Sequence, residues 1–322
     1  MIIVTGAAGF IASVTANQLL DAGKLLLLVD DFSRMEKERN FSRFSPKQLI
    51  DRTEFPNWLE NNAQSVEAVI HLGARTDTAE QSVELFNRLN LDYSKTLWKL
   101  CTKHQIRFIY ASSAATYGDG TLGFDDDHSN LDALKPLNPY GDSKHQFDLW
   151  ALAQAKQPPF WFGLKFFNVY GPNEYHKSRM ASVIFHTFNQ VNATGGMKLF
   201  RSHNPEFKDG EQLRDFVYVK DVYSVINFLL NHQKSSDSGI YNLGTGQARH
   251  FLDLAKATFK AMKKPEHISY IDMPVDIRAN YQYYTQANMT KLSEIGYDVP
   301  FTSLEDGVRD YVSNYLTLNK TL

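Results

Sequence analysis

A tyrosine and a lysine stand four residues apart, at Tyr140 and Lys144, in a stretch (138–156) whose pattern predicts a helix. Side chains at positions i and i+4 share one face of a helix, so the phenol and the ammonium lie side by side. Ionising a free tyrosine at neutral pH costs about 4 kcal/mol. A neighbouring positive charge lowers this cost, and burial strengthens its effect. The pair could therefore remove a proton from a substrate hydroxyl.

A serine could act on the same oxygen. Ser113 lies in the sequence YASSAATYG, which directly follows an apolar run that predicts a strand. Its hydroxyl could hydrogen-bond to the same substrate oxygen from which Tyr140 would remove the proton. The alternative is that Ser112 and Ser113 only form a turn. A Tyr and a Lys at this spacing occur by chance in many helices, so the pair gains weight from the serine and from the elements around it.

A glycine-rich turn near the start of the chain predicts a second site. Gly6, Gly9 and Ala12 stand at three-residue spacing between a predicted strand and a predicted helix. Such a turn lets backbone N–H groups approach a pyrophosphate at the helix N-terminus. Asp30 ends the second predicted strand, where an acid would reach an adenine ribose hydroxyl. We therefore predict a bound dinucleotide; the alternative is a structural turn that binds nothing.

The residues after Asp30 leave the type of dinucleotide open. Asp30 should repel a 2′-phosphate, which favours NAD. Arg34, Lys37 and Arg39 follow closely and could bind the phosphate of NADP, or they could form a solvated loop. An oxidised nicotinamide carries a positive charge, which would favour the phenolate of Tyr140.

The elements that must position these side chains alternate along the first half of the chain. Short apolar runs predict strands, and stretches of helical period separate them, as in a parallel sheet covered on both faces. The predicted fold class is α/β, a Rossmann-like doubly wound parallel sheet with a smaller, interleaved C-terminal substrate lobe. The predicted strands are 1–5, 25–29, 66–72, 107–111 and 160–167, and the predicted helices are 10–22, 79–104 and 138–156.

The pattern becomes irregular after about residue 168. Residues 1–167 and about 213–238 are assigned to a dinucleotide-binding domain, and about 168–212 and 239–322 to a substrate domain. The predicted elements in this half are helices at 180–191, 221–232, 249–262 and 303–318 and strands at 215–219 and 240–243.

Composition narrows the class of protein. The 322 residues exceed the roughly 150 of one domain. A net charge of -2 leaves no basic field for nucleic acid or an anionic membrane, and no apolar run approaches the roughly 20 residues that span a bilayer. The single cysteine, Cys101, is expected to be buried and inert, which favours a reducing, cytoplasmic location. The ten histidines show no paired ligand spacing, so no metal site is expected.

Taken together, the motifs resemble a known family. The Gly6/Gly9 turn, the sequence HLGA at 71–74, Ser113 and the Tyr140/Lys144 pair are similar to those of the extended short-chain dehydrogenase/reductases that modify nucleotide sugars. Within that family, the chain resembles the ADP-heptose 6-epimerase group, and the stretch FFNVYGPNEYHKSRMASVIFH (166–186) is the most specific part.

The resemblance implies a set of site residues. It implies Tyr140 and Lys144 as the catalytic pair, Ser113 beside them and Lys177 as a second acid/base. The implied cofactor contacts are Gly6, Gly9, Phe10, Ile11, Asp30, Asp31, Lys37, Arg52, Leu72, Gly73, Ala74, Arg75, Thr76, Asn90, Tyr140, Lys144, Val169 and Lys177. The implied substrate contacts are Asn168, Arg179, His186, Phe200, Arg201, Ser202, His203, Arg214 and Tyr281.

The chain also departs from the family pattern. Ala12 replaces the third glycine, Arg75 stands where a small residue is usual, and Arg179 stands where a serine contacts substrate. The stretch 204–213, which follows the implied contacts 200–203, is longer than the family's loop.

The resemblance implies a reaction and its partners. An ADP-heptose, a precursor of the lipopolysaccharide core, would be oxidised at C6 and reduced on the opposite face. The implied cofactor is NADP, with NAD as the alternative, and the implied assembly is a homo-oligomer, a pentamer in this group. Lys177 could instead clamp the substrate diphosphate. The other functions considered are a UDP- or dTDP-hexose 4-epimerase, a 4,6-dehydratase and a non-catalytic dinucleotide sensor.

Overall fold

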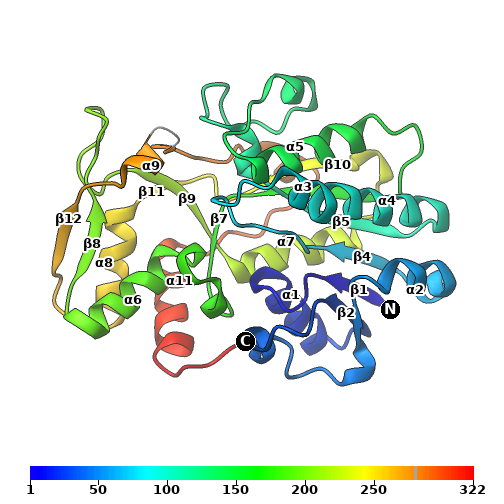
Figure 1. Cartoon of the computed structure of the whole chain (residues 1–322), viewed down its shortest axis with the longest axis horizontal. Helices are drawn as coiled ribbons and strands as arrows, with labels where there is room; N and C mark the ends of the chain where they lie inside the picture. The colour runs from blue at the N-terminus through cyan, green and yellow to red at the C-terminus, as the bar shows by residue number, and fades with distance from the viewer. Residues whose placement is uncertain (279–280) are drawn as a thin grey trace.

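A seven-stranded parallel sheet forms the centre of the molecule (Figure 1). The computed structural model describes residues 1–278 and 281–322, without the side chains of 276 and 277. The strand order is β10-β6-β5-β4-β1-β2-β3, and every neighbouring pair is parallel, which confirms the predicted doubly wound α/β class. The strands are β1 (Ile2–Thr5), β2 (Leu26–Asp30), β3 (Leu49–Asp51), β4 (Ala68–His71), β5 (Arg107–Ser113), β6 (Trp161–Phe166) and β10 (Gly239–Leu243).

Helices cover both faces because successive strand residues point to opposite sides. Ile3 of β1 packs into one core with α2, α4 and α5, while Ile2 and Val4 pack into another with α1 and α7. Both cores exclude water from solidly apolar strands. The helices are α1 (Phe10–Asp21), α2 (Phe55–Asn62), α3 (Val83–Phe86), α4 (Tyr93–His104), α5 (Pro139–Leu152) and α7 (Val219–Asn231).

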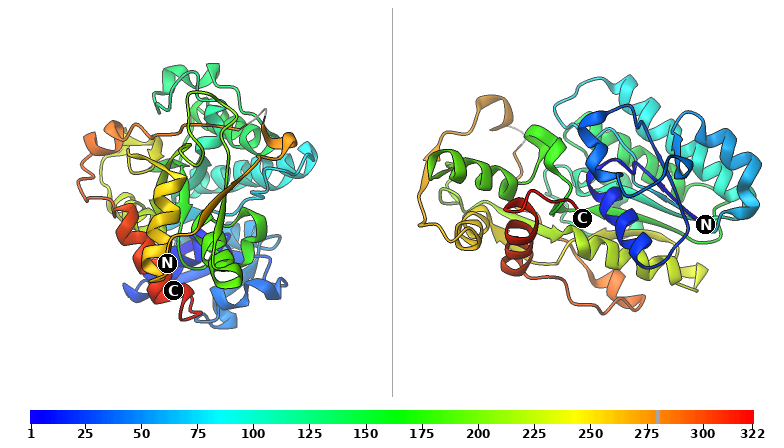
Figure 2. Two further views of the ribbon diagram at one scale, coloured as in Figure 1. Left: turned by 90° about the vertical axis from the view of Figure 1, so that its left-hand side faces the viewer. Right: turned by 90° about the horizontal axis from the view of Figure 1, so that it is seen from below.

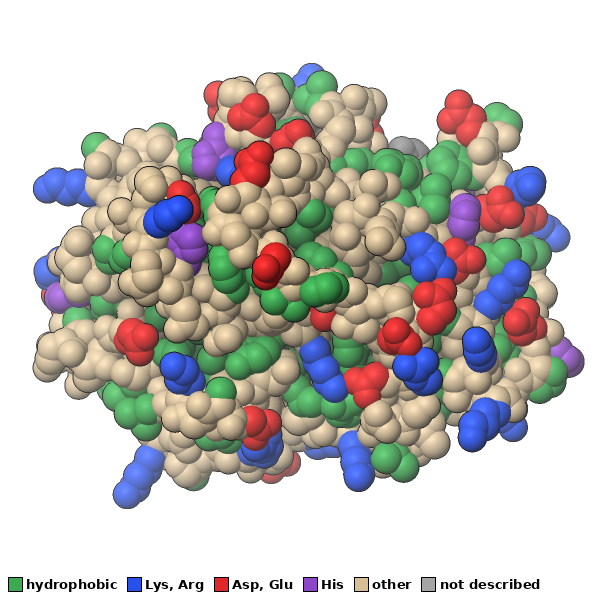
Figure 3. Space-filling model, turned by 180° about the vertical axis from the view of Figure 1, so that it is seen from behind, with side chains coloured by type: hydrophobic (Ala, Val, Ile, Leu, Met, Phe, Trp, Pro, Cys, Tyr) green, Lys and Arg blue, Asp and Glu red, His purple; other side chains and the backbone are tan. Residues whose placement is uncertain are grey.

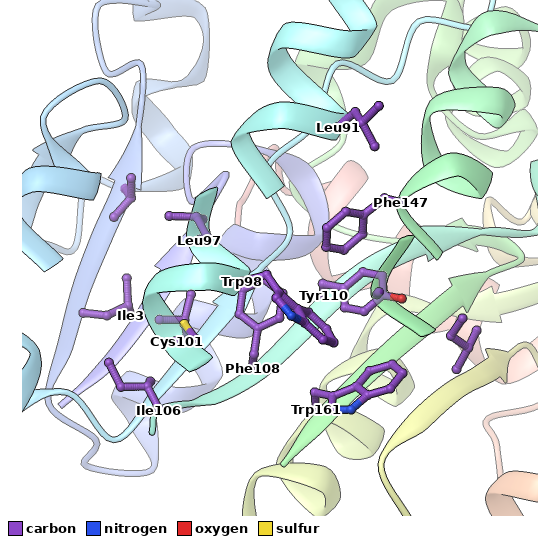
Figure 4. Close-up of a cluster of buried hydrophobic side chains, with 14 of the residues drawn as sticks. Ile3, Leu91, Leu97, Trp98, Cys101, Ile106, Phe108, Tyr110, Phe147 and Trp161 are labelled. Atoms are coloured by element: carbon purple, nitrogen blue, oxygen red, sulfur yellow. The ribbon is translucent and has the colours of Figure 1, made fainter. Parts of the chain in front are cut away.

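An aromatic cluster fixes α4 and α5 on the sheet. The ring of Trp98 lies 5.0 Å from that of Trp161 and 5.9 Å from that of Phe108, both in edge-on contacts that favour association (Figure 4). Cys101 lies in the same cluster and is fully buried, and burial raises the pKa of its thiol. The thiol is therefore a packing group, as predicted.

A smaller lobe is built from two short sheets and the helices beside them. In one sheet β9 pairs in parallel with β7 and antiparallel with β11; in the other β8 pairs with β12. Figures 1 and 2 place this lobe at one end of the large sheet. Its elements are β7 (Asn168–Tyr170), α6 (Val183–Thr194), β8 (Met197–Phe200), β9 (Leu213–Tyr218), β11 (Ala248–His250), α8 (Phe251–Ala261), β12 (Ile268–Ile271), α9 (Val275–Arg278) and α11 (Leu304–Asp310). The short helix α10 (Thr290–Glu294) instead contacts β10 and places Leu292 in a core of the large sheet.

Two strands differ from the expected placement. Residues 239–243 were expected in the smaller lobe but form β10, the edge strand of the large sheet, where all five residues are buried. Residues 213–218 were expected with the large sheet but form β9 of the smaller lobe, although the following helix α7 does pack on the large sheet. The chain crosses between the lobes at these points, which periodicity cannot show. The division into two domains remains a prediction.

Several helices are shorter or more broken than predicted. The stretch expected as one helix at 79–104 begins only at Val83 and contains a π-helical turn at Asn87–Asp92 before α4. The helix expected at 303–318 likewise changes from α11 to a π-helical turn at Tyr311–Leu316. A tight helical segment at Tyr175–Met180 precedes α6 and contains Ser178 in a left-handed conformation, with φ 49°.

The last residues of the chain return to the first half. Arg39 donates to the side-chain and main-chain oxygens of Asn319, and the backbone N–H of Leu322 donates to Asn173 Oδ1 at 2.8 Å. On the face seen in Figure 3, acidic and basic side chains are interspersed. Among the described residues, none of the helices is long and apolar enough to cross a membrane.

Candidate active site

The turn between β1 and α1 is shaped for close backbone approach. Gly6 has φ +70°, and a Cβ there would lie 2.5 Å from the Cα of Gly73, at the end of β4. Gly9 caps α1, and a Cβ on it would lie 2.9 Å from the carbonyl oxygen of Gly6. Within the described residues, no side chain caps α1 and no acid lies in its first turn. The first N–H groups of α1, near Phe10 and Ile11, therefore suit an anionic group.

The end of β2 places two acids beside this turn. The carboxylate of Asp30 accepts from the N–H of Ala8 at 2.9 Å and from the N–H of Asp31 at 2.7 Å. Asp31 lies 3.8 Å from Arg34 and 3.9 Å from Arg52, which follows β3. The acidic and basic groups predicted to bind the adenosine half thus lie together at the carboxyl ends of β2 and β3.

Lys37 reaches toward the other half of the chain. It lies in the helical turn Met35–Asn40 and is half-buried. Together with Lys177, and after the larger effect of burial, it lowers the pKa of His176 to about 4. His176 is therefore neutral at pH 7, and Lys37 lies near the segment that carries Lys177.

The predicted catalytic groups meet at the end of β5. Ser113 is its last residue and lies beside Tyr140, which is in the first turn of α5. Burial raises the pKa of Tyr140, and the nearby hydroxyl of Ser113 opposes that effect. One turn later, Lys144 Nζ donates to the carbonyl oxygen of Ala111 at 2.7 Å, and burial lowers its pKa to about 8. Among the described residues, no hydrogen bond joins Lys144 to Tyr140.

A buried network ties the loop after β4 to the catalytic helix. Asn90, in the π-helical turn, accepts from the N–H of Arg75 at 2.8 Å and donates to the carbonyl oxygen of that residue at 3.0 Å. The amide nitrogen of Asn90 also lies 3.0 Å from Ser143 Oγ, which donates to the carbonyl oxygen of Tyr140. Asn90 therefore fixes the position of residues 72–76 relative to α5.

His71 lies directly beneath this network. Its ring nitrogens are 2.6 Å from Thr5 Oγ1 and 2.9 Å from Ser94 Oγ. Complete burial, with a smaller effect of Lys144, lowers the pKa of His71 to about 3. The imidazole is therefore a neutral hydrogen-bonding group that links β1, β4 and α4.

Lys177 approaches the same edge of the sheet from the smaller lobe. Its ammonium lies 5.5 Å from the centre of the Phe10 ring, at the start of α1. Burial lowers the pKa of Lys177, and the charge of Glu174 opposes that effect. Glu174 is itself buried and accepts from the N–H and the hydroxyl of Ser182, each at 2.6 Å. These bonds hold together the two ends of the segment that carries Lys177.

Arg214 is a buried cation. Its side chain is 7% exposed, burial lowers its pKa, and its guanidinium donates to the carbonyl oxygens of Leu213 and Gln282. The guanidinium carbon lies 5.1 Å from the centre of the Tyr281 ring. Within the described part of the chain, no carboxylate pairs with it. A planar cation held in this way suits a phosphate oxygen.

Four of the predicted substrate residues have other partners. Arg179 pairs with Asp77 at 2.9 Å, and Arg201 lies 3.4 Å from Asp272. His203 Nε2 accepts from the N–H of Met273 at 3.3 Å, and Ser202 Oγ donates to Asn204 O at 2.7 Å.

The remaining predicted positions differ in exposure. Asn168 is exposed at the start of β7, Val169 beside it is half-buried, and Phe200 ends β8. His186 in α6 is half-buried, and the centre of its ring lies 6.2 Å from that of Phe185.

Sequence reasoning missed several residues that organise the site. Asn40 donates to the carbonyl oxygens of Ala8 and Asn173, which joins the glycine turn to the smaller lobe. Asp148 lies one turn after Lys144 on α5, and the i, i+4 spacing could have identified it. Asp77, which bridges Arg75 and Arg179, had no spacing signal because it lies in a loop.

The comparisons with known proteins agree with this geometry. The model of the NAD dependent epimerase/dehydratase family matches residues 2–244. A protein of Fusobacterium nucleatum named ADP-L-glycero-D-manno-heptose-6-epimerase is 50% identical, and the match covers 98% of each chain. A protein of the same name from Nitratidesulfovibrio vulgaris is 46% identical, again over 98% of each chain.

A solved structure extends the agreement to three dimensions. The ADP-L-glycero-D-manno-heptose-6-epimerase of Helicobacter pylori is 27% identical, with a TM-score of 0.79 over 97% of this chain and 95% of that one. Family model, full-length relatives and fold therefore agree with the resemblance drawn from the motifs. The chain belongs to the NAD dependent epimerase/dehydratase family, and its full-length relatives there bear the name ADP-L-glycero-D-manno-heptose-6-epimerase.

Proposed function

We propose that this chain interconverts ADP-D-glycero-D-manno-heptose and ADP-L-glycero-D-manno-heptose by transient oxidation at C6. Relatives of that name match the chain over its full length at 46% and 50% identity. The observation that carries the chemistry is the placement of Ser113, at the end of β5, beside Tyr140, in the first turn of α5, at the edge where the glycine turn opens.

The residues at this edge fit a nicotinamide dinucleotide. The close approach of Gly6 to Gly73 and the uncapped start of α1 suit a pyrophosphate, and Asp30 and Asp31 lie where an adenosine ribose would bind. Residues 72–76 and Asn90 would line the same groove. A nicotinamide dinucleotide held by these residues would supply a reversible acceptor for the C6 hydride.

NADP is the form of the cofactor that we propose. Arg34 and Arg52 lie within 4 Å of Asp31, and Lys37 lies near His176, so cations surround the acids at the end of β2. The family description names NAD, and Asp30 also favours NAD. Mass spectrometry of the nucleotide released from denatured protein decides between them: NADP is expected, and NAD alone would contradict the proposal.

The chain's own residues handle the proton. Tyr140, oriented by Ser113, takes the C6 hydroxyl proton as the hydride departs, which leaves a ketone. The cation of Lys144 stabilises the phenolate from one turn along α5. Rotation about the C5–C6 bond then presents the opposite face of the ketone. Because the oxygen now points elsewhere, Lys177 supplies the proton on that side, and its lowered pKa suits this role.

Arg214 and Tyr281 hold the nucleotide part of the substrate in this scheme. The guanidinium is buried, with its carbon 5.1 Å from the centre of the Tyr281 ring. Among the described residues it pairs with no carboxylate, so it can donate to the diphosphate without first breaking an ion pair. Arg179, now paired with Asp77, would have to exchange that partner to contact substrate. We therefore propose Arg214 as the main diphosphate contact.

The test is proton NMR of ADP-D-glycero-D-manno-heptose incubated with the purified protein and no added cofactor. We expect the L-glycero diastereomer to appear, because a retained nucleotide completes the cycle. No conversion, even after NADP and NAD are supplied, would contradict the heptose proposal. The same assay on UDP- and dTDP-hexoses would then test the hexose 4-epimerase alternative, which does not call for Lys177.

We also propose a homo-oligomer, with a pentamer as the expected state, and a cytoplasmic location. The first rests on the family resemblance and the second on the single buried cysteine. Light scattering coupled to size exclusion checks the assembly, and a monomer under assay conditions would contradict it.

A further inference from the structure

A buried ion pair lies behind the proposed catalytic residues. Lys165 Nζ of β6 is 2.9 Å from Asp148 Oδ2 of α5, and both side chains are fully buried. A pair without exposed atoms has lost all hydration of its charges, so its geometry depends on further hydrogen bonds. None of the proton transfers described above uses either residue.

The further hydrogen bonds all lead to β5 and its end. Tyr110 Oη donates to Asp148 Oδ1 at 2.9 Å, and Ser112 Oγ donates to Asp148 Oδ2 at 2.6 Å. Lys165 Nζ donates to Thr116 Oγ1 at 2.6 Å, and Thr116 in turn donates to the carbonyl oxygen of Ser113 at 2.8 Å. The pair therefore holds the backbone on both sides of Ser113.

The same pair faces Lys144. Asp148 follows Lys144 by one helical turn, and the Lys144 ammonium donates to Ala111, between the two β5 residues that donate to Asp148. The charge of Asp148 raises the pKa of Lys144 against the larger, opposite effect of burial. The other titratable groups around Lys144 and the pair are His71, Tyr110, Tyr117, His128, His145 and Lys291.

We propose that Asp148, with Lys165 as its counter-ion, is a positioning residue that sets the placement of Ser113 and the charge of the Lys144 ammonium. Removing the carboxylate leaves Lys165 as an uncompensated neighbour of Lys144. Removing Lys165 leaves the carboxylate to act on Lys144 alone. The two variants should therefore move the titration of Lys144 in opposite directions, whereas a purely structural role would give no such opposition.

The experiment is a ¹³C NMR titration of the full-length protein carrying lysine labelled at Cε, with Lys144 assigned by its loss in Lys144→Met. In the wild type we expect a midpoint near pH 8. In Asp148→Asn we expect it to fall by about one unit or more, and in Lys165→Met to rise. Asp148→Glu, which keeps the charge, should return the midpoint toward the wild-type value.

Two outcomes would overturn the inference: a Lys144 midpoint that stays unchanged in both variants, or one that shifts in the same direction in both. If Asp148→Asn does not fold, Lys165→Met is compared with the double variant Asp148→Asn/Lys165→Met, and the Lys144 midpoint is expected to be lower in the double variant, which lacks the carboxylate. The NMR titration needs no substrate, so its failure is separate from failure of the epimerase proposal. Where the epimerase proposal holds, the upper pH limit of kcat should move with the midpoint.

Discussion

Several residues of the candidate site have pKa values shifted away from their ordinary values. Burial holds the pKa of Lys144 near 8 and that of His71 near 3, and it lowers the pKa of Lys177. Groups whose pKa is shifted in this way cluster at functional sites, because acid and base chemistry at neutral pH requires them. The pKa of Tyr140, in contrast, is raised. The phenol therefore depends on neighbouring cations to ionise.

The role of Lys177 can be separated from simple substrate binding. Lys177→Met is expected to lower kcat by about 10²- to 10⁴-fold with little change in KM, because one face of the ketone loses its proton donor. Lys256→Met, an exposed lysine on α8, is the matched control and should behave as wild type. A raised KM with unchanged kcat would instead assign Lys177 to the substrate diphosphate.

The sequence predicted the type and the spacing of the site residues, but not the residues with which they pair. Tyr140 and Lys144 were placed on one helix face, and Ser113 at a strand end, and the structure has them there. The pairing of Arg179 with Asp77 could not be predicted, because it joins a loop to a short helical segment about one hundred residues away. Such a contact leaves no periodic signal in the chain.

The candidate site residues lie at the carboxyl ends of β1, β2, β4 and β5. These ends share one edge of the sheet because the strands are parallel. Long strands buried on both faces and the glycine turn could be read from the sequence. β3 and β7 could not, since each has three residues and depends on its neighbours. The π-helical turns at Asn87–Asp92 and Tyr311–Leu316 also escape periodicity, which treats such stretches as ordinary helix.

The turn after β1 gives a prediction with a matched control. Gly6→Ala is expected to lower the free energy of unfolding by about 1–3 kcal/mol more than Gly23→Ala, and to abolish cofactor retention. Both glycines have φ near +70°, so both variants strain the backbone equally. A Cβ at Gly6 meets Gly73, while at Gly23 it meets nothing within 4 Å.

Stability is measured by urea unfolding. Cofactor retention is measured as the ratio of nucleotide absorbance to protein absorbance in the ultraviolet spectrum of each purified protein. Equal destabilisation of the two variants, with cofactor retained in both, would show that the β1 and β4 ends do not approach as closely as described.

Across the whole molecule, one buried histidine, His71, and one half-buried histidine, His176, should make folding sensitive to acid. The pKa of His71 is about 3 and that of His176 about 4, while an unfolded histidine titrates near 6.5. Their contribution to stability is complete above pH 6.5 and is lost as pH falls toward these values, because the unfolded chain binds the extra protons. Each histidine contributes a slope of about 1.4 kcal/mol per pH unit in that window.

The measurement is urea unfolding at pH 7 and pH 5 for wild type, His71→Gln and His267→Gln. His71→Gln should lose less stability between the two pH values than wild type. His267 is exposed, so its variant should follow wild type. Parallel losses in all three proteins would mean that His71 is not held neutral.

The lobes bring distant parts of the chain to one edge of the sheet, and this arrangement supports the central claim of transient oxidation at C6. The most direct measurement uses ADP-D-glycero-D-manno-heptose carrying deuterium at C6, incubated with the purified protein in ordinary water. We predict that the L-glycero product keeps its deuterium at C6, because the same hydride returns to the opposite face. Product that carries hydrogen from water at C6 would contradict the account, since inversion would then proceed by proton exchange.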